Sequence, residues 1–145
     1  SVEIKADVVR KDPHEHGLRR ALNLGHTAGH AFESFAISQG KPVPHGYAVA
    51  WGLVIDAILS HFSCGFNSKL VHRIADYVLY NYNAFFFTCN DYDKLIELMR
   101  NDKKSQHGEI NCTLLGAPGD IRIDCVVNPQ TMKEAFDLYR DLMHI

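Results

Sequence analysis

The sequence has few cysteines, no excess of charge of one sign, and no long uninterrupted apolar run. Its 145 residues include four cysteines that are far apart and form no CxxC pair: Cys64, Cys89, Cys112 and Cys125. This spacing argues against a zinc ribbon, and we expect the thiols to be reduced and mostly buried. The formal net charge of −2 excludes the overall basic field that is typical of nucleic-acid-binding proteins.

The apolar segments and the chain start are also informative. The longest apolar segments, at residues 48–59 and 84–88, are too short or too interrupted to cross a bilayer, and no signal peptide is visible. We therefore expect a cytoplasmic protein with neither a membrane nor a nucleic acid as partner. Residues 1–9 already have helical apolar spacing, without an initiating Met or a capping residue. We expect this chain to be a piece of a longer protein.

The remaining pattern predicts a single, mainly α-helical domain. The hydrophobic fraction of 46% and the charged fraction of 22% are those of a soluble globular protein. Helical spacing predicts helices at residues 2–9, 18–37, 45–64, 68–82, 91–100 and 129–143. The helix at 45–64 is apolar on nearly all sides, which predicts a central position. Partly alternating β-branched residues at 110–115 and 121–127 predict a hairpin. The expected fold is a multi-helical bundle with one small β-hairpin near the C-terminus.

Three histidines form the most informative pattern. His26 and His30 are four residues apart, which places them on one face of a helix. His45 begins the next helical segment and can meet them if the two helices pack antiparallel. Neutral imidazoles are common zinc ligands, and a catalytic zinc has three protein ligands and an open position. Spacing alone does not decide which histidine binds metal and which binds substrate. Because Thr27 stands where the HExxH signature has Glu, a zinc protease is excluded.

Two glycines flank the histidines. Gly25 and Gly29 each disfavour a helix interior by about 1 kcal/mol relative to alanine. Their presence on an otherwise good helix predicts that another group approaches the backbone closely at this point.

A polar stripe precedes the histidines. On one helix over residues 18–37, the side chains of Arg19, Asn23, His26 and His30 would form a continuous face. Such a face suits an anionic, hydroxyl-rich ligand, because arginine binds carboxylate or phosphate bidentately; the alternative is a solvated surface. Further cations for a phosphate site are Lys5 and the pair Lys103 and Lys104, although charged loop residues are usually only solvated.

These motifs resemble a known family. Residues 17–33, GLRRALNLGHTAGHAFE, resemble the GLRxxLNxGHTxGHAxE segment of 3-dehydroquinate synthases, and residues 45–50, HGYAVA, are similar to their HGEAVA segment. The DKK sequence at 102–104, with GEI at 108–110 and LL at 114–115, is similar to the family's DKK…GxI…LL stretch. The resemblance runs nearly end to end. It identifies the chain as the C-terminal, helical half of such an enzyme, without the upstream Rossmann-like NAD domain.

The resemblance implies a metal and a nicotinamide cofactor. His26 and His45 would be ligands of Zn²⁺ or Co²⁺, and the third ligand, a Glu, would lie in the upstream domain. NAD would bind mainly to that domain, so the resemblance assigns no cofactor contact in this chain. The family commonly forms homodimers.

The resemblance also implies a set of substrate contacts: Lys5, Arg19, Asn23, His30, Lys103 and Lys104. His30 and Asn23 would contact the phosphate and its neighbouring oxygens, while Arg19 and Lys5 would bind the carboxylate end and adjacent hydroxyls. One lysine of the 103/104 pair would assist at the phosphate, and the sequence does not settle which. His30 and Lys5 are the implied catalytic residues.

The implied reaction converts 3-deoxy-D-arabino-heptulosonate 7-phosphate to 3-dehydroquinate and phosphate. This carbon–oxygen lyase step belongs to the shikimate pathway of chorismate and aromatic amino acid biosynthesis. A hydroxyl is oxidised by NAD, phosphate is eliminated, the ketone is reduced again, and the opened ring closes by an aldol step. The substrate phosphate acts as the base for its own departure. We expect the isolated chain to be inactive.

One position departs from the family pattern, and three alternatives stay open. Tyr47 replaces the usual Glu, so we predict retained zinc binding with altered contacts around the ligand. Another sugar-phosphate cyclase is the nearest alternative, although Arg19, Asn23 and His30 favour a carboxylate-bearing substrate. Metal-dependent alcohol and glycerol dehydrogenases have comparable histidine segments, but they do not need the cations Lys5 and Arg19. The third alternative is a non-catalytic metal-binding helical module.

Overall fold

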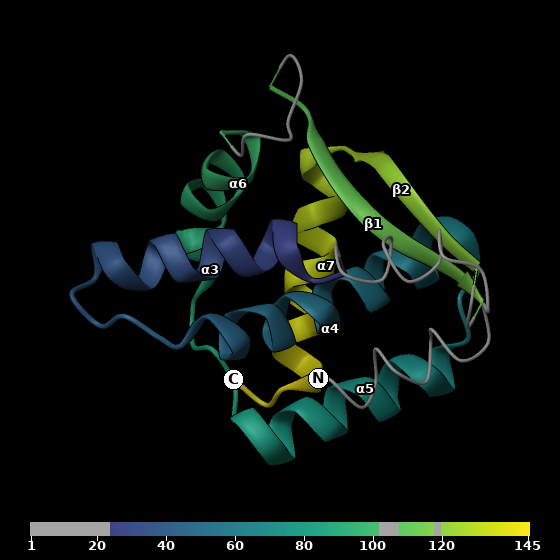
Figure 1. The fold of residues 1–145 in the computed structure, drawn as a ribbon, viewed down its shortest axis with the longest axis horizontal. Helices are drawn as coiled ribbons and strands as arrows, with labels where there is room; N and C mark the ends of the chain where they lie inside the picture. Colours follow the sequence, from purple (N-terminus) through teal and green to yellow (C-terminus); the bar gives the residue numbers. More distant parts are fainter. Residues whose placement is uncertain (1–23, 102–107, 118–119) are drawn as a thin grey trace.

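Helix α4 (His45–Cys64) forms the centre of the structure, a computed structural model that describes residues 24–101, 108–117 and 120–145. Every residue from Ala48 to Ser60 is buried. A helix that is apolar on all sides needs other elements around it. Four elements contact α4: α3 (His26–Ser38), α5 (Ser68–Tyr82), α7 (Pro129–Leu142) and β1 (Ile110–Ala117) (Figure 1). By length and composition α4 could cross a membrane, but 72% of its most apolar stretch is buried inside the protein. It is therefore a core helix, and its predicted central position is confirmed.

The other described helices are α3 (His26–Ser38), α5 (Ser68–Tyr82), α6 (Tyr92–Arg100) and α7 (Pro129–Leu142), with a 3₁₀ turn η1 (Cys89–Asp91) before α6. Three of them pack on α4, and the fourth, α6, packs on α3 instead. The helices predicted at 45–64, 68–82, 91–100 and 129–143 are confirmed to within one residue at each end. The helix predicted at 2–9 lies outside the described residues.

Local capping explains where several of these helices begin. The side chain of Asn67 accepts a hydrogen bond from the Lys69 N–H, and that of Asn128 accepts one from Thr131 N–H, both at 2.8 Å. Each bond satisfies one backbone donor that a helix start leaves without a helical partner. Asp91 directly precedes α6, but its carboxylate accepts a hydrogen bond from the N–H of Thr88 and does not cap α6.

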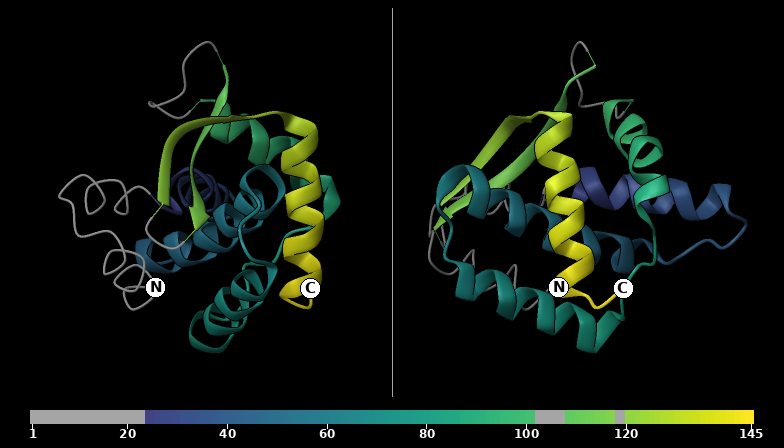
Figure 2. Two further views of the ribbon diagram at one scale, coloured as in Figure 1. Left: turned by 90° about the vertical axis from the view of Figure 1, so that its right-hand side faces the viewer. Right: turned by 180° about the vertical axis from the view of Figure 1, so that it is seen from behind.

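The predicted hairpin is confirmed. Strands β1 (Ile110–Ala117) and β2 (Asp120–Val127) pair antiparallel, with Ile110 opposite Val127 and Ala117 opposite Asp120. The register is irregular between Cys112 and Leu114 and again before Ala117. Figure 2 shows the hairpin lying across the helices, with α7 following directly from β2. The fold is therefore the expected multi-helical bundle with one small β-hairpin.

Two side-chain hydrogen bonds attach β1 to the helices. The hydroxyl of Thr27 on α3 donates to the carbonyl of Asn111 at 2.7 Å, and the Leu115 N–H donates to the hydroxyl of Ser60 on α4 at 2.8 Å. Thr27 and Ser60 are both buried. Because buried polar groups are costly without partners, these bonds fix the hairpin at one position on the bundle.

The prediction that the cysteines are mostly buried is wrong. All four are free thiols, but only Cys112 is buried, while Cys89 is exposed and Cys64 and Cys125 are half-buried. The physical reason is position: Cys112 is buried within β1, whereas Cys64 is the last residue of α4 and Cys89 is the first residue of η1. Element ends are surrounded by fewer neighbours than element centres.

The start of α3 differs from the predicted helix over 18–37. Gly25 has a φ of +79° and forms the N-terminal cap of α3, so the helix begins at His26. Residues 24 and 25 form a turn. A left-handed backbone conformation cannot continue an α-helix, and glycine adopts it at low cost. The prediction of one uninterrupted helix through Gly25 is therefore wrong. Arg19 and Asn23 lie outside the described residues, so the stripe that would join them to the histidines stays a prediction.

Candidate functional site

Three histidine rings meet where α3 passes the beginning of α4. The ring centroids of His26 and His30 lie 5.6 Å apart, those of His26 and His45 5.9 Å apart, and those of His30 and His45 5.8 Å apart. The rings thus form a nearly equilateral triangle. His26 and His30 come from α3, one turn apart, and His45 is the first residue of α4. The prediction that antiparallel packing brings His45 to the other two is confirmed.

Close backbone packing produces this meeting point. A Cβ on Gly29 would lie 3.0 Å from the Ala48 carbonyl oxygen, and one on Gly25 would collide with the backbone of Val49 and Leu53. Residues later in α3 therefore lie beside residues earlier in α4, which is an antiparallel arrangement (Figure 1). The group predicted to approach Gly25 and Gly29 is the backbone of α4. Glycine is needed at both positions because any larger residue would separate the helices that carry the histidines.

Two of the rings are oriented through their Nδ1 atoms. His26 Nδ1 lies 3.2 Å from the carbonyl oxygen of Leu24, and His45 Nδ1 lies 3.0 Å from Oε1 of Glu33. A carbonyl or carboxylate oxygen can only accept a hydrogen bond. Each ring must therefore be the donor in its contact, with the proton on Nδ1. The Nε2 atom then has the lone pair that a metal ion would use. Metal-binding histidines usually have this arrangement, with the second ring nitrogen donating to a carbonyl or a carboxylate.

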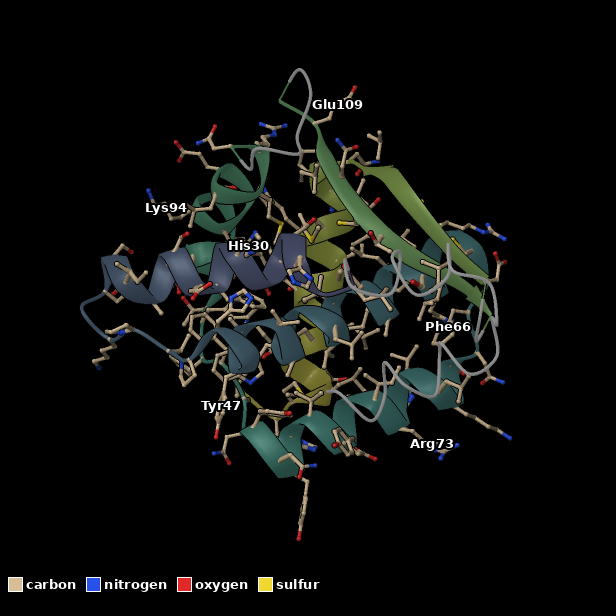
Figure 3. The ribbon with its side chains drawn as sticks, in the orientation of Figure 1. His30, Tyr47, Phe66, Arg73, Lys94 and Glu109 are labelled. Atoms are coloured by element: carbon tan, nitrogen blue, oxygen red, sulfur yellow. The ribbon has the colours of Figure 1, made fainter. Side chains whose placement is uncertain are left out.

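The triangle is open to solvent. His45 is exposed, and His26 and His30 are half-buried. Figure 3 labels His30 on α3, and its ring lies 5.8 Å from that of His45 on α4. Across residues 24–101, 108–117 and 120–145, no group of three or more His, Cys, Asp or Glu side chains is placed so that it could hold a metal ion. The donor set fits a zinc-type ion only in part: imidazole nitrogens of suitable tautomer are available, and further ligands would have to come from outside these ranges.

Tyr47, the position that departs from the family pattern, belongs to an aromatic cluster. Its ring packs edge-on against Tyr82 at 5.0 Å and against Trp51 at 6.1 Å between centroids. Figure 3 places Tyr47 on the side of α4 toward the end of α5. The carboxylate that meets His45 is that of Glu33 instead.

Two residues of this region were not singled out from the sequence. Glu33 was read only as the last letter of a motif, although it lies three residues after His30 on the same helical face. Asp56 is the other: its carboxylate is 1% exposed and accepts a hydrogen bond from the Gly25 N–H at 2.6 Å. A single acidic residue within the apolar α4 was the available signal, because a buried carboxylate requires a partner.

The structure describes three of the predicted site residues, His26, His30 and His45, and brings them together. The others lie outside the described residues: Lys5, Arg19, Asn23, Lys103 and Lys104. Their contribution to a substrate site stays a prediction.

Comparison with known proteins gives consistent matches. A family model described as 3-dehydroquinate synthase C-terminal matches residues 1–105. A 3-dehydroquinate synthase from Parabacteroides distasonis is 47% identical over 97% of this chain, and one from Geobacillus kaustophilus is 38% identical over 84%. The chain spans 40% and 33% of the lengths of these two relatives.

A solved structure shares the fold. The crystal structure of 2-deoxy-scyllo-inosose synthase superposes with a TM-score of 0.59 over 81% of this chain and 32% of that one, at 20% sequence identity. The arrangement of helices and hairpin described above is therefore found in an enzyme of distant sequence. From the family match and the identity to its members, the chain belongs to the 3-dehydroquinate synthase family and corresponds to that family's C-terminal domain.

Proposed function

We propose that the protein containing this chain converts 3-deoxy-D-arabino-heptulosonate 7-phosphate to 3-dehydroquinate and phosphate. The observation that carries the proposal is the histidine triangle at the crossing of α3 and α4, in a chain of this family. The reaction is a phosphate elimination followed by ring closure, and the enzyme is a lyase of the shikimate pathway.

His26 and His45 are the proposed ligands of Zn²⁺ or Co²⁺. They are the two rings whose Nδ1 atoms lie beside the Leu24 carbonyl and the Glu33 carboxylate. Bound there, the metal would supply Lewis acidity, which lowers the pKa of a coordinated hydroxyl and favours its oxidation. The remaining ligand, a Glu, would come from the upstream domain.

His30 is the proposed substrate contact within the described residues. Its ring lies 5.6 Å from that of His26, between centroids, so it faces the same small volume as the two proposed ligands. A neutral or protonated imidazole there can donate a hydrogen bond to a phosphate oxygen. The proposed remaining contacts to the two anionic ends of the substrate are Lys5, Arg19, Asn23 and one lysine of the 103/104 pair. Holding both ends keeps the reacting carbons aligned through several steps.

The proposal assigns NAD binding and the third metal ligand to the upstream part of the protein. The chain spans 40% of the Parabacteroides distasonis relative, and NAD is proposed to bind mainly to the part that corresponds to the remainder. We therefore expect no turnover by the chain alone.

Phosphate release tests the proposal. A hybrid enzyme joins the upstream part of the Parabacteroides distasonis relative to this chain and receives zinc, catalytic NAD and the heptulosonate phosphate. We expect phosphate release that disappears with His26→Ala or Arg19→Ala. The matched control is Ser34→Ala, at an exposed position of α3, which should keep full activity; the unaltered relative verifies the assay.

The alternatives give different outcomes in the same experiment. Steady NADH formation from simple polyols, without phosphate release, would assign the protein to the alcohol and glycerol dehydrogenases. Turnover of another ketose phosphate in preference to the heptulosonate would assign it to another sugar-phosphate cyclase. Either result would overturn the proposal.

A further inference from the structure

Glu33 lies on the same face of α3 as the two histidines of that helix. It follows His26 by seven residues and His30 by three, and residues at these separations are stacked along one side of a helix. The antiparallel packing of α4 places His45 beside this face. As a result, the Glu33 carboxylate reaches the His45 ring, with Oε1 3.0 Å from Nδ1.

The contact contributes little to the stability of the fold. The side chain of His45 is 56% exposed and that of Glu33 is 29% exposed. Exposed ion pairs and hydrogen bonds of this kind contribute between about 0 and 1 kcal/mol. The consequence of the contact is instead chemical, because it selects one tautomer of the ring and one ring orientation.

The two oriented rings are held by different means. His26 is aligned by the main chain, since its partner is the carbonyl oxygen of the fully buried Leu24. His45 is aligned by a side chain, and it follows the exposed Gln39–Pro44 connection, in which only Val43 is partly buried. Removing the Glu33 carboxylate would therefore affect His45 and leave His26 in place.

From these observations we infer that Glu33 is a positioning residue, which holds His45 with its proton on Nδ1 and its Nε2 lone pair directed into the histidine triangle. Position 47 is a tyrosine and supplies no carboxylate for this purpose; its ring packs against Tyr82 and Trp51. The inference rests on the proposed function in one respect, namely that His45 Nε2 is a metal ligand. The tautomer itself does not depend on that function.

The tautomer is tested first, on this chain without metal. Nitrogen-15 NMR of the imidazole rings at pH 8, where histidines are mostly neutral, reports which nitrogen of His45 carries the proton. We expect the Nδ1–H form to dominate in the unaltered chain and in Glu33→Gln, whose amide oxygen still accepts a hydrogen bond. Glu33→Ala should shift His45 toward the tautomer mixture of a free imidazole, while the His26 signals stay unchanged.

Metal affinity is tested second, in the hybrid enzyme, by competition with a chromophoric zinc chelator. Loss of a partner of this kind typically weakens metal binding by about 10–100-fold, and we expect a loss in this range for Glu33→Ala. The loss should be smaller for Glu33→Gln and absent for the control Ser34→Ala. Thermal unfolding should be the same for all four proteins, which separates positioning from a structural role.

Each result has a defined meaning. If His45 has the same tautomer ratio in the unaltered chain and in Glu33→Ala, the inference is overturned. It is also overturned if the ratio shifts but zinc affinity does not fall. If the hybrid with Glu33 intact binds zinc and releases no phosphate, the proposed function fails, and the tautomer shift and affinity loss still decide the role of Glu33.

Discussion

The carboxylate of Asp56 on α4 accepts a hydrogen bond from the backbone N–H of Gly25, immediately before α3, at a distance of 2.6 Å. Asp56 is 1% exposed and is separated from Gly25 by 31 residues. Its carboxyl group lies at the N-terminus of α3, where the helix leaves backbone N–H groups without helical partners. The bond fixes the turn from which His26 begins, so a core residue of one helix sets the position of a candidate ligand on another.

Asp56→Ala should therefore destabilise the protein. A buried backbone N–H left without its partner costs about 1–3 kcal/mol, and we expect a loss of at least this size in urea unfolding. Asp76→Ala, at an exposed position of α5, is the matched control and should stay within about 0.5 kcal/mol of the parent. Equal stability of the two variants would contradict the anchoring role of Asp56.

Alanine substitutions at two glycines of α4 should change the stability of the protein in opposite directions. A Cβ on Gly52 would collide with the backbone of Gly25 and Gly29, whereas one on Gly46 meets nothing within 4 Å. Gly52→Ala forces the helices apart, and overpacking of this kind costs about 1–3 kcal/mol. Gly46→Ala gains helix propensity of up to about 1 kcal/mol. Thermal unfolding of the two variants measures the expected loss and the expected gain of stability. A Gly52→Ala protein as stable as its parent would show that α3 and α4 can separate without cost.

Tyr139 should make the protein sensitive to alkali. Burial raises the pKa of this phenol well above its usual range, although a hydrogen bond from the Phe85 N–H partly opposes the shift. Below about pH 10 the phenol is neutral in both states. Above that pH the unfolded chain loses the proton and the folded protein retains it, so stability falls by up to about 1.4 kcal/mol per pH unit.

The measurement is urea unfolding between pH 8 and pH 11 for the parent and Tyr139→Phe. We expect Tyr139→Phe to be less stable at neutral pH by about 1–3 kcal/mol, because the Phe85 N–H loses its acceptor. Its stability should fall less steeply above pH 10. Tyr80→Phe is the control, since that ring is 89% exposed, and it should keep the parental slope. A parental slope in Tyr139→Phe would count against this prediction.

Tyr47→Glu should alter stability more than metal binding. Edge-on aromatic pairs contribute about 0.5–1.5 kcal/mol, and the substitution removes the contacts of this ring with Tyr82 and Trp51. We expect a loss of about 1 kcal/mol, which Tyr47→Phe should not show. Because Glu33 already accepts from His45 Nδ1, zinc affinity of the hybrid enzyme should change by less than about tenfold. A larger gain in affinity would assign the orienting role to position 47.

The helices and the hairpin could be predicted from local patterns. Residues 45–64 are apolar on every face and 68–82 on one face, and these patterns place one helix in the centre and the other on its surface. The predicted limits agree with α4 and α5, because apolar spacing, Asn67 as a cap and Gly65 as a terminator all act within a few residues of the boundary.

The boundary of α3 could not be predicted in this way. Residues with good helix propensity lie on both sides of Gly25, and its φ of +79° arises where the backbone of α4 and the Asp56 carboxylate contact it. Propensity is a weak local preference that tertiary contacts override. The surroundings of Tyr47 could not be predicted from local patterns either, because its aromatic partner Tyr82 is the last residue of α5.

The sequence by itself determined the family, the helical class and the identity of the three histidines, because motif spacing and apolar periodicity are properties of neighbouring residues. Only the tertiary structure decided that the Gly25 N–H meets Asp56 across 31 residues, that Thr27 meets Asn111 across 84, and that Glu33 orients His45 across 12. The physical reason is that such contacts depend on how closely and in which direction two helices cross. In this protein the crossing distance is set by the backbones that meet at Gly25, Gly29 and Gly52.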